Sequence, residues 1–178
     1  TEHTYIMHLG LLNESSHEHV NDIPTETAVT YLHTALERLR QNPMIEAASI
    51  SYHSSPHQWS NRSRGLHRDT VSTRYPTLNR TVTPDFFRVF RYQSTNGSTD
   101  ELVRALERGE LVISTEVEKE LFGKDESAVG QYISFEKSDS AQQYTVGAVS
   151  DVIRYDNFSN WSAYFAQRLE NDLLESFS

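Results

Sequence analysis

The sequence of 178 residues contains no cysteine, so it can form neither a disulfide nor a metal site built on thiolates. No apolar run approaches the ~20 residues that a membrane-spanning helix needs. With 37% hydrophobic and 23% charged residues, the composition also excludes a bundle of such helices. A chain of this length can bury most of its apolar surface without cross-links, so it suits one domain or two small intertwined ones.

Positive charge is scarce as well, with 16 Lys and Arg against 25 Asp and Glu and a net charge of -9. Because Lys and Arg supply most of the affinity for phosphates, this balance argues against a general nucleic-acid partner. The charges are also unevenly placed. Ser54 to Arg91 contains seven Arg against two Asp, and Asp100 to Glu126 contains nine acidic against four basic residues. These two segments face either one another or a partner surface.

Sequence signatures of catalysis are missing too. There is no G-x-S-x-G elbow, no G-x-x-x-x-G-K phosphate loop and no G-x-G-x-x-G turn. The tightest histidine group, His17-Glu18-His19, lies in a polar stretch and lacks a third ligand at a recognisable spacing. We therefore expect no catalytic residue, no metal site and no bound cofactor in this chain.

The first part of the chain has a β-α-β pattern. Thr4–Leu12 mixes β-branched, aromatic and aliphatic residues as strands do, and the polar stretch Asn13–Asp22 is typical of a loop. Alanines and leucines at helical spacing predict a helix that opens at Pro24 and ends at Asn42. Alternation in Ile45–His53 predicts a second strand.

The second part begins with a change of composition. Residues 54 to about 68 are rich in Ser, Arg, His and Asn, and we interpret them as an exposed connection into a second subdomain. At the other end, Leu173–Ser178 has the apolar spacing of an amphipathic helix that has only begun. Between them we expect the strands Arg74–Val82, Leu111–Ser114, Gln131–Glu136, Gln143–Val152 and Ala163–Leu169, and the helices Asp85–Phe90, Asp100–Glu107 and Thr115–Phe122.

Four motifs in this second part follow one another in a fixed order. An aromatic segment precedes a glycine, a V-I-S strand leads to a helix ending in L-F-G, an S-x-x-G-x-x-I turn follows, and a tyrosine-valine-glycine strand ends near an aspartate. The motif residues are Thr83, Pro84, Phe86, Phe87, Phe90, Gly97, Val112, Ile113, Ser114, Leu121, Phe122, Gly123, Ser127, Gly130, Ile133, Tyr144, Val146, Gly147 and Asp151.

In this order, over about Ile45 to Leu169, the motifs closely resemble the MacB-like periplasmic core domain of ABC transporter permeases. This group shares its membrane topology with FtsX and LolC/LolE. One departure lies at Val146-Gly147-Ala148-Val149, where family members often have V-V-G-V-V.

The resemblance implies an α+β fold in which a porter-like β-α-β subdomain carries an inserted mixed α/β subdomain, often called Sabre. We expect residues 1–53 and 161–178 to form the porter-like subdomain, with its C-terminal part incomplete. Residues 54–160 would form the Sabre-like subdomain.

The resemblance also implies roles for the motif residues. Phe86, Phe87 and Phe90 would anchor the core of the inserted part, contributing about 2 kcal/mol or more each. Arg88 and Arg91 would lie outside it. The glycines of the motifs are expected at backbone turns, at positions Gly97, Gly123, Gly130 and Gly147.

The function implied by the resemblance is mechanical. Such a domain is the periplasmic segment of an inner-membrane permease whose ATPase lies in the same chain or on a partner subunit. ATP-driven dimerisation in the cytoplasm is relayed through the membrane helices. Paired ectodomains, one from each of two permease copies, then act on cargo or a periplasmic adaptor. The domain itself would be non-catalytic, with no cofactor and no nucleic-acid partner.

A competing interpretation is a stand-alone periplasmic sensor or adaptor that binds a peptide or partner protein through the arginine-rich connection, which extends to Arg80. Clustered arginine is chemically suited to a partner surface. Apolar segments flanking the chain would favour the permease, and polar ones the adaptor. The candidate surface residues are Trp59, Arg62, Arg64, Arg68 and Arg74.

Overall fold

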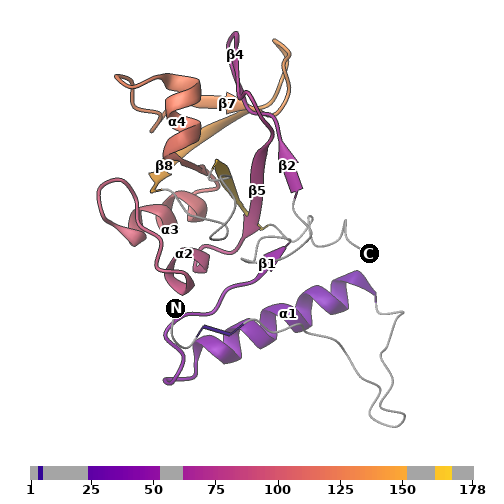
Figure 1. The fold of residues 1–178 in the computed structure, drawn as a ribbon. Coiled ribbons are helices and arrows are strands. Elements are labelled where there is room, and N and C mark those ends of the chain that lie inside the picture. Colours follow the sequence, from indigo (N-terminus) through magenta and orange to yellow (C-terminus); the bar gives the residue numbers. More distant parts are fainter. Residues whose placement is uncertain (1–3, 6–23, 53–61, 152–162, 170–178) are drawn as a thin grey trace.

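The computed structural model describes residues 4–5, 24–52, 62–151 and 163–169, and the fold is α+β. Within these ranges, one curled, mixed sheet of nine strands carries short helices on its faces, and a longer helix lies beside it (Figure 1). The strands are β1 (Ser51–Tyr52), β2 (Arg62–Arg64), β3 (His67–Arg68), β4 (Val71–Ser72), β5 (Thr77–Val82), β6 (Leu111–Ser114), β7 (Tyr132–Ser134), β8 (Gln143–Ser150) and β9 (Tyr164–Arg168).

The strand order in the sheet is β1-β5-β9-β6-β8-β7-β3-β4, and β2 also pairs with β5. The pairs β5/β9 and β6/β8 are parallel, whereas the other pairs are antiparallel. Parallel neighbours require crossover connections, and helices supply them here. The order therefore brings together segments that are far apart in the sequence.

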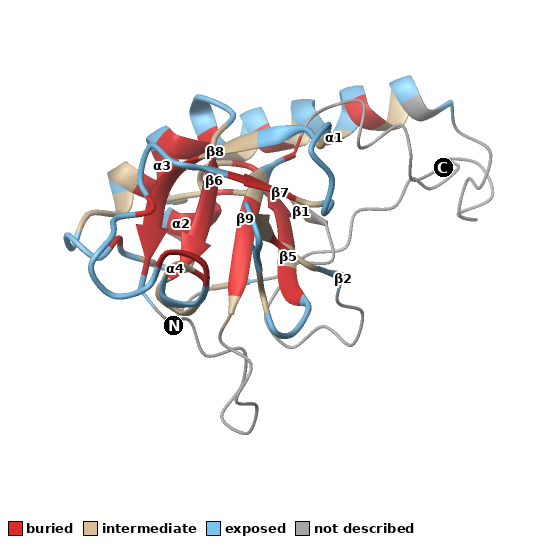
Figure 2. Cartoon of the chain, turned by 90° about the horizontal axis from the view of Figure 1, so that it is seen from above, coloured by how far each residue is buried: buried red, intermediate tan, exposed pale blue. Residues whose placement is uncertain are grey.

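The sheet is covered on both faces. Helices α2 (Phe86–Val89) and α3 (Thr99–Glu107) pack on one face, and α4 (Thr115–Phe122) packs on the other. All four residues of β6 are buried, as a strand enclosed on two sides requires. Figure 2 shows the buried residues concentrated in the sheet and in the helix faces that contact it.

Helix α1 (Thr25–Arg40) differs from these short helices. It begins after Pro24 and ends before Gln41, so the helix predicted between Pro24 and Asn42 is confirmed. Two of its apolar residues, Val29 and Leu36, are buried, but most of its length is exposed (Figure 2). Its C-terminal end lies nearest α2 (Figure 1).

The strand predicted for Ile45–His53 is largely wrong, because among the described residues 45–52 only Ser51 and Tyr52 form a strand; His53 lies outside the described ranges. The Ile45 N–H donates to the Asn42 carbonyl in a turn. The Ile50 N–H donates to the Thr83 side-chain hydroxyl at 3.0 Å, outside any strand ladder. A turn and a side-chain hydroxyl thus satisfy backbone groups that a longer strand would have used.

The exposed connection predicted up to Arg68 is also more ordered than expected, since β2 and β3 lie within it. The other predicted strands and helices between Arg74 and Leu169 are present, with ends that differ by a few residues. Predictions for most of Thr4–Leu12, for Asn13–Asp22 and for Leu173–Ser178 concern residues outside the described ranges; Thr4 and Tyr5 are not in a strand.

Gly147 corrects one expectation about the glycines. Gly97, Gly123 and Gly130 have positive φ angles of 79°, 81° and 83°, as turns require. Gly147 instead lies inside β8, where Leu111 pairs with Val146 but the next residue of β6 pairs with Ala148, so Gly147 is the extra residue of a β-bulge. A Cβ there would lie 2.7 Å from the Ala105 Cβ, so glycine allows α3 to approach the strand.

The division into two subdomains stays a prediction, but the strand pairing shows how the parts meet. Strand β9 belongs to the segment 161–178 that we assigned to the porter-like part. It pairs with β5 on one side and β6 on the other, and both lie in the segment 54–160 assigned to the inserted part. The two segments therefore share one sheet.

Candidate functional site

Strand β2 carries two of the five residues proposed as a partner surface. It forms an antiparallel pair with β5, and Ser63 lies opposite Leu78. Arg62 and Arg64 point to the same side of this short strand, and all three of its residues are exposed. The Arg64 guanidinium lies 5.2 Å from the centre of the Phe135 ring, a cation-π contact that orients it. Trp59 lies outside the described residues.

Arg68 is held by contacts within the fold. Its guanidinium donates two hydrogen bonds to the Glu126 carboxylate, at 2.9 and 2.6 Å, and lies 4.3 Å from the centre of the Phe122 ring. The hydrogen bond with Glu126 raises the pKa of Arg68, and the bond from Arg68 lowers the pKa of Glu126. Arg68 therefore fastens β3 to the end of α4, and its charge is already paired.

Arg74 lies between β4 and β5 and is exposed. Its backbone N–H donates to the Glu120 carboxylate on α4, and its guanidinium lies 5.4 Å from the centre of the Tyr75 ring. Arg80, at the end of the proposed connection, is only 3% exposed and cannot contribute to a surface. It occupies the face of β5 that also carries Leu78, toward the α2–α3 core.

The acidic and basic segments do face one another at several points. Arg68 pairs with Glu126, and Arg88 pairs with Asp100 at 2.9 Å. Both pairs join the arginine-rich segment to the acidic one. The first alternative for the uneven charge is therefore confirmed at these positions. The arginines of β2 and Arg74 after β4 are exposed.

The aromatic motif forms a corner of the core. Phe86 and Phe87 are fully buried, with ring centres 5.9 Å apart in an edge-to-face arrangement. Phe90 is partly buried, with its ring centre 4.8 Å from that of Phe86. Arg88 and Arg91 are exposed, so the expected placement is confirmed. The rings contact one another and the sheet, which leaves them no part in a stacking surface for bases.

Sequence reasoning missed the interior polar contacts of β9. The Tyr164 N–H donates to the Ser114 hydroxyl at 3.1 Å, which ties β9 to the end of β6. The Arg80 guanidinium lies 5.8 Å from the centre of the Tyr164 ring, and burial raises the pKa of the Tyr164 phenol. The serine of the V-I-S motif was the only sequence signal for this contact, and it did not identify the partner.

A set of ion pairs between helices was also missed. Arg40, in the last turn of α1, pairs with Asp85 at 2.7 Å, and Asp85 pairs with Arg88 of α2 at 2.5 Å. Arg88 in turn reaches Asp100 of α3. Sequence spacing could show the Asp85/Arg88 pair but not the contact between Arg40 and Asp85, which are 45 residues apart.

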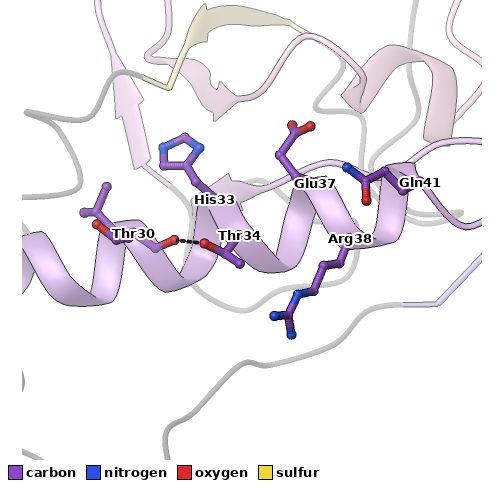
Figure 3. A pocket seen from close by; sticks show the side chains of 7 residues that line it. Thr30, His33, Thr34, Glu37, Arg38 and Gln41 are labelled. Carbon is purple, nitrogen blue, oxygen red and sulfur yellow. Dashed lines mark hydrogen bonds between the residues drawn. The ribbon is translucent and has the colours of Figure 1, made fainter.

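A pocket of about 560 Å³ lies along α1 between Val29 and Gln41 (Figure 3). Its polar side chains come from one helix and do not converge: Arg38 points away from His33 and Glu37. Ligand sites usually place a few polar groups around one apolar hollow, and this pocket lacks that arrangement. It does not identify a ligand.

Other chemical sites were sought across the described ranges. No group of three or more His, Asp or Glu residues within them could hold a metal ion. In the same ranges, no helix has the length and apolar character needed to cross a membrane.

The sequence model of the MacB-like periplasmic core domain matches residues 10–171. The structure is similar to the periplasmic region of MacB from Actinobacillus actinomycetemcomitans, with a TM-score of 0.52 and 13% identity over 90% of this chain and 61% of that one. It is also similar to the extracellular domain of the noncanonic ABC-type transporter YknZ from Gram-positive bacteria, with a TM-score of 0.51 and 13% identity over 81% of this chain and 64% of that one.

No curated protein matches the sequence. The chain spans a little under two thirds of each solved domain, and at such low identity the structural likeness shows the fold alone. The family match is independent of that likeness and covers most of the chain, including every motif residue named above. The chain therefore belongs to the family of MacB-like periplasmic core domains, the extracytoplasmic domains of ABC transporter permeases.

Proposed function

We propose that the chain relays an ATP-driven conformational change from a membrane permease to cargo or partners outside the cytoplasm. The family match over residues 10–171 carries this proposal, because it assigns the chain to a transporter ectodomain. The domain would work by moving, without catalysis and without a cofactor.

A mechanical relay needs a body that does not deform, and the sheet supplies one. Apolar clusters on its two faces share strands β6, β8 and β9, so the helices on one face are packed to those on the other through the same strands. Close-packed interiors transmit displacement because they are hardly compressible. A force applied at one end of the sheet would therefore move the whole body.

The proposed partners follow from the permease class. An ABC ATPase, in the same chain or on a separate subunit, would drive the movement from the cytoplasm. A second permease copy would supply the paired ectodomain, and cargo or a periplasmic adaptor would be the target. The complete protein would lie in the inner membrane with this segment in the periplasm.

The first test is the hydropathy of the coding sequence on both sides of the chain. We expect an apolar run of about 20 residues before Thr1 and three more after Ser178. Polar flanks, or a cleaved signal peptide in place of the membrane helices, would overturn the permease mechanism. The stand-alone adaptor that uses the exposed arginines would then be the better hypothesis.

The second test measures movement in the complete permease. Because the chain has no cysteine, the substitution Tyr132→Cys creates the single labelling site of this domain, at the exposed start of β7, in each of two permease copies; any cysteine elsewhere in the permease is first replaced by serine. We expect the distance between the labels to differ between the nucleotide-free and the ATP-trapped transporter. The matched control is a variant whose ATPase cannot bind ATP. An identical distance in both states of the active protein would contradict the relay.

A further inference from the structure

Five charged residues join α1, α2 and α3 in one continuous set of contacts. Glu37 pairs with Arg40 at 2.8 Å, Arg40 with Asp85 at 2.7 Å, Asp85 with Arg88 at 2.5 Å, and Arg88 with Asp100 at 2.9 Å. We call this set, Glu37–Arg40–Asp85–Arg88–Asp100, the ion-pair chain. The charges alternate in sign along it, so each residue pairs only with residues of opposite charge.

The centre of the ion-pair chain is fixed to the body of the fold. Asp85 precedes α2 directly and is only 19% exposed, and both of its carboxylate oxygens accept from arginine. The next two residues, Phe86 and Phe87, are fully buried in the core beneath α3. Arg88, on the same turn, has its pKa raised by hydrogen bonds to Asp100 and Asp85. Any movement of Asp85 is thereby a movement of the α2–α3 corner.

The segment after α1 reaches the same corner. The Ile50 carbonyl accepts from the Thr83 N–H at 2.9 Å, and the Ser49 and Thr83 hydroxyls lie 2.9 Å apart. Glu46 pairs with Arg91 at 3.4 Å. The contacts of α1 and of the segment that follows it therefore converge on residues 83–91, which contain α2 and the residues on either side of it.

We infer that the ion-pair chain is the conformational joint through which α1 and the α2–α3 corner of the sheet move as one. This inference rests on the proposed mechanical function and names a route for it within the domain. Arginine suits such a joint because its planar fork holds two carboxylates at once. Such contacts are directional, so they hold the end of α1 in one orientation against the corner.

Linked ion pairs and four independent surface ion pairs lead to different predictions in one respect. If the pairs are linked, removing the charge of Asp100 must weaken the hold on Arg40, although these two residues do not contact each other. Without Asp100 its attraction for Arg40 is lost while the repulsion between Arg88 and Arg40 remains, so the net electrostatic hold on Arg40 weakens. Independent pairs predict no effect of Asp100 on α1.

The experiment is a double-mutant cycle on the 178-residue chain with Arg40→Gln, Asp100→Asn and both together. The readout is hydrogen exchange of the backbone amides in the last turn of α1. We expect each single substitution to speed this exchange about two- to five-fold, in line with partly exposed ion pairs. The double variant should exchange no faster than Arg40→Gln alone, because the link is already broken.

Two controls keep the result specific. Arg38→Gln removes an arginine from the same turn of α1 without touching the ion-pair chain, so it should leave the exchange rate unchanged. The amides of β6, which is buried throughout, report global unfolding, and in every variant their exchange should change less than that of the last turn of α1. Raising the salt concentration to about 1 M should erase the effect of Asp100→Asn, since charges are screened over about 3 Å there.

The inference is overturned if Asp100→Asn leaves α1 unchanged, or if the two substitutions multiply as independent effects. This outcome is separable from failure of the proposed function. If the isolated chain shows coupling but the distance between the spin labels does not change with ATP, the relay is disproved and the inference about the ion-pair chain is retained. ATP-dependent movement without coupling would disprove the joint alone.

Discussion

Helix α1 and the sheet body are held in place by different forces. The body, residues 62–151 and 163–169, encloses strands such as β6 between two apolar clusters, and its large side chains are fully buried. Helix α1 has two buried apolar residues, and polar contacts at its C-terminal end reach the corner at Asp85. Among the described residues, the side-chain contacts that join the C-terminal end of α1 to the body include the ion pair between Arg40 and Asp85, which water and salt can weaken.

This difference separates stability from coupling. Apolar burial contributes most of the free energy of unfolding, so the body should govern whether the domain folds. Surface ion pairs contribute little to that free energy but are directional. Substitutions in the body should therefore change global unfolding, whereas substitutions at the ion-pair chain should change local exchange in α1.

The largest effect is expected at the aromatic corner. Replacing fully buried Phe87 with Ala removes a ring packed against Phe86 and Tyr92, which should lower the free energy of unfolding by about 3–5 kcal/mol. Urea denaturation followed by circular dichroism measures it. Tyr132→Ala, at a residue 58% exposed, is the control and should stay within about 0.5 kcal/mol. Equal effects at the two positions would contradict the assignment of the core.

The bulge at Gly147 should come next. In Gly147→Ala the new methyl group would meet the side chains of Ala105 and Glu110, so α3 must move away from β8 at a cost of about 1–3 kcal/mol. Gly97→Ala is the matched comparison, because Gly97 has a positive φ but open space around it. Backbone strain alone should cost about 1 kcal/mol there. If Gly97→Ala is the more damaging of the two, the close approach of α3 is not what Gly147 provides.

The sequence was informative where structure is local. The helix from Pro24, the buried strand Leu111–Ser114 and the helix that ends at Gly123 all follow from short-range periodicity and end residues. The burial of Phe86 and Phe87 was also predictable, through the resemblance of the aromatic motif to a known family. The helices and the strand depend on neighbours within a turn or two of the chain, whereas the burial of Phe86 and Phe87 also depends on α3 and the sheet.

What could not be predicted depends on pairing between distant segments. Nothing local shows that β9 lies between β5 and β6, or that a bulge at Gly147 changes which residues of β8 face each cluster. From the sequence Arg80 is expected to be exposed, but in the structure α2 and α3 cover its face of β5 and bury it. The contact between Arg40 and Asp85 likewise depends on tertiary structure. For the same reason the sequence did not show that Arg68 of the candidate partner surface pairs with Glu126.

A smaller effect is expected where Arg68 fastens β3 to the body. Arg68 lowers the pKa of Glu126 below its ordinary value of 4.5 through a hydrogen bond. A carboxyl whose pKa is lower in the folded state stabilises the fold above its unfolded pKa and loses that contribution as the pH falls through the folded pKa. The native chain should therefore lose more stability than Glu126→Gln between about pH 7 and about pH 3.

Urea midpoints for both proteins at the two pH values measure that difference. Glu136→Gln, at an exposed residue beyond β7, is the control, and its stability should fall with pH as that of the native chain does. If Glu126→Gln loses as much stability on acidification as the native chain, the pair with Arg68 adds nothing to the hold on β3.

The smallest effect on global stability is expected at α1 itself. Arg40→Gln removes two ion pairs from a side chain that is 35% exposed, so the free energy of unfolding should change by no more than about 1 kcal/mol. Arg38→Gln, in the same turn, should be indistinguishable from it in a urea titration. A cost for Arg40→Gln as large as that for Gly147→Ala would mean that α1 unfolds together with the sheet. In that case the contrast between a rigid body and a separately attached helix would be wrong. The ion-pair chain would then not be needed to couple α1 to the α2–α3 corner, because the two would already form one unit.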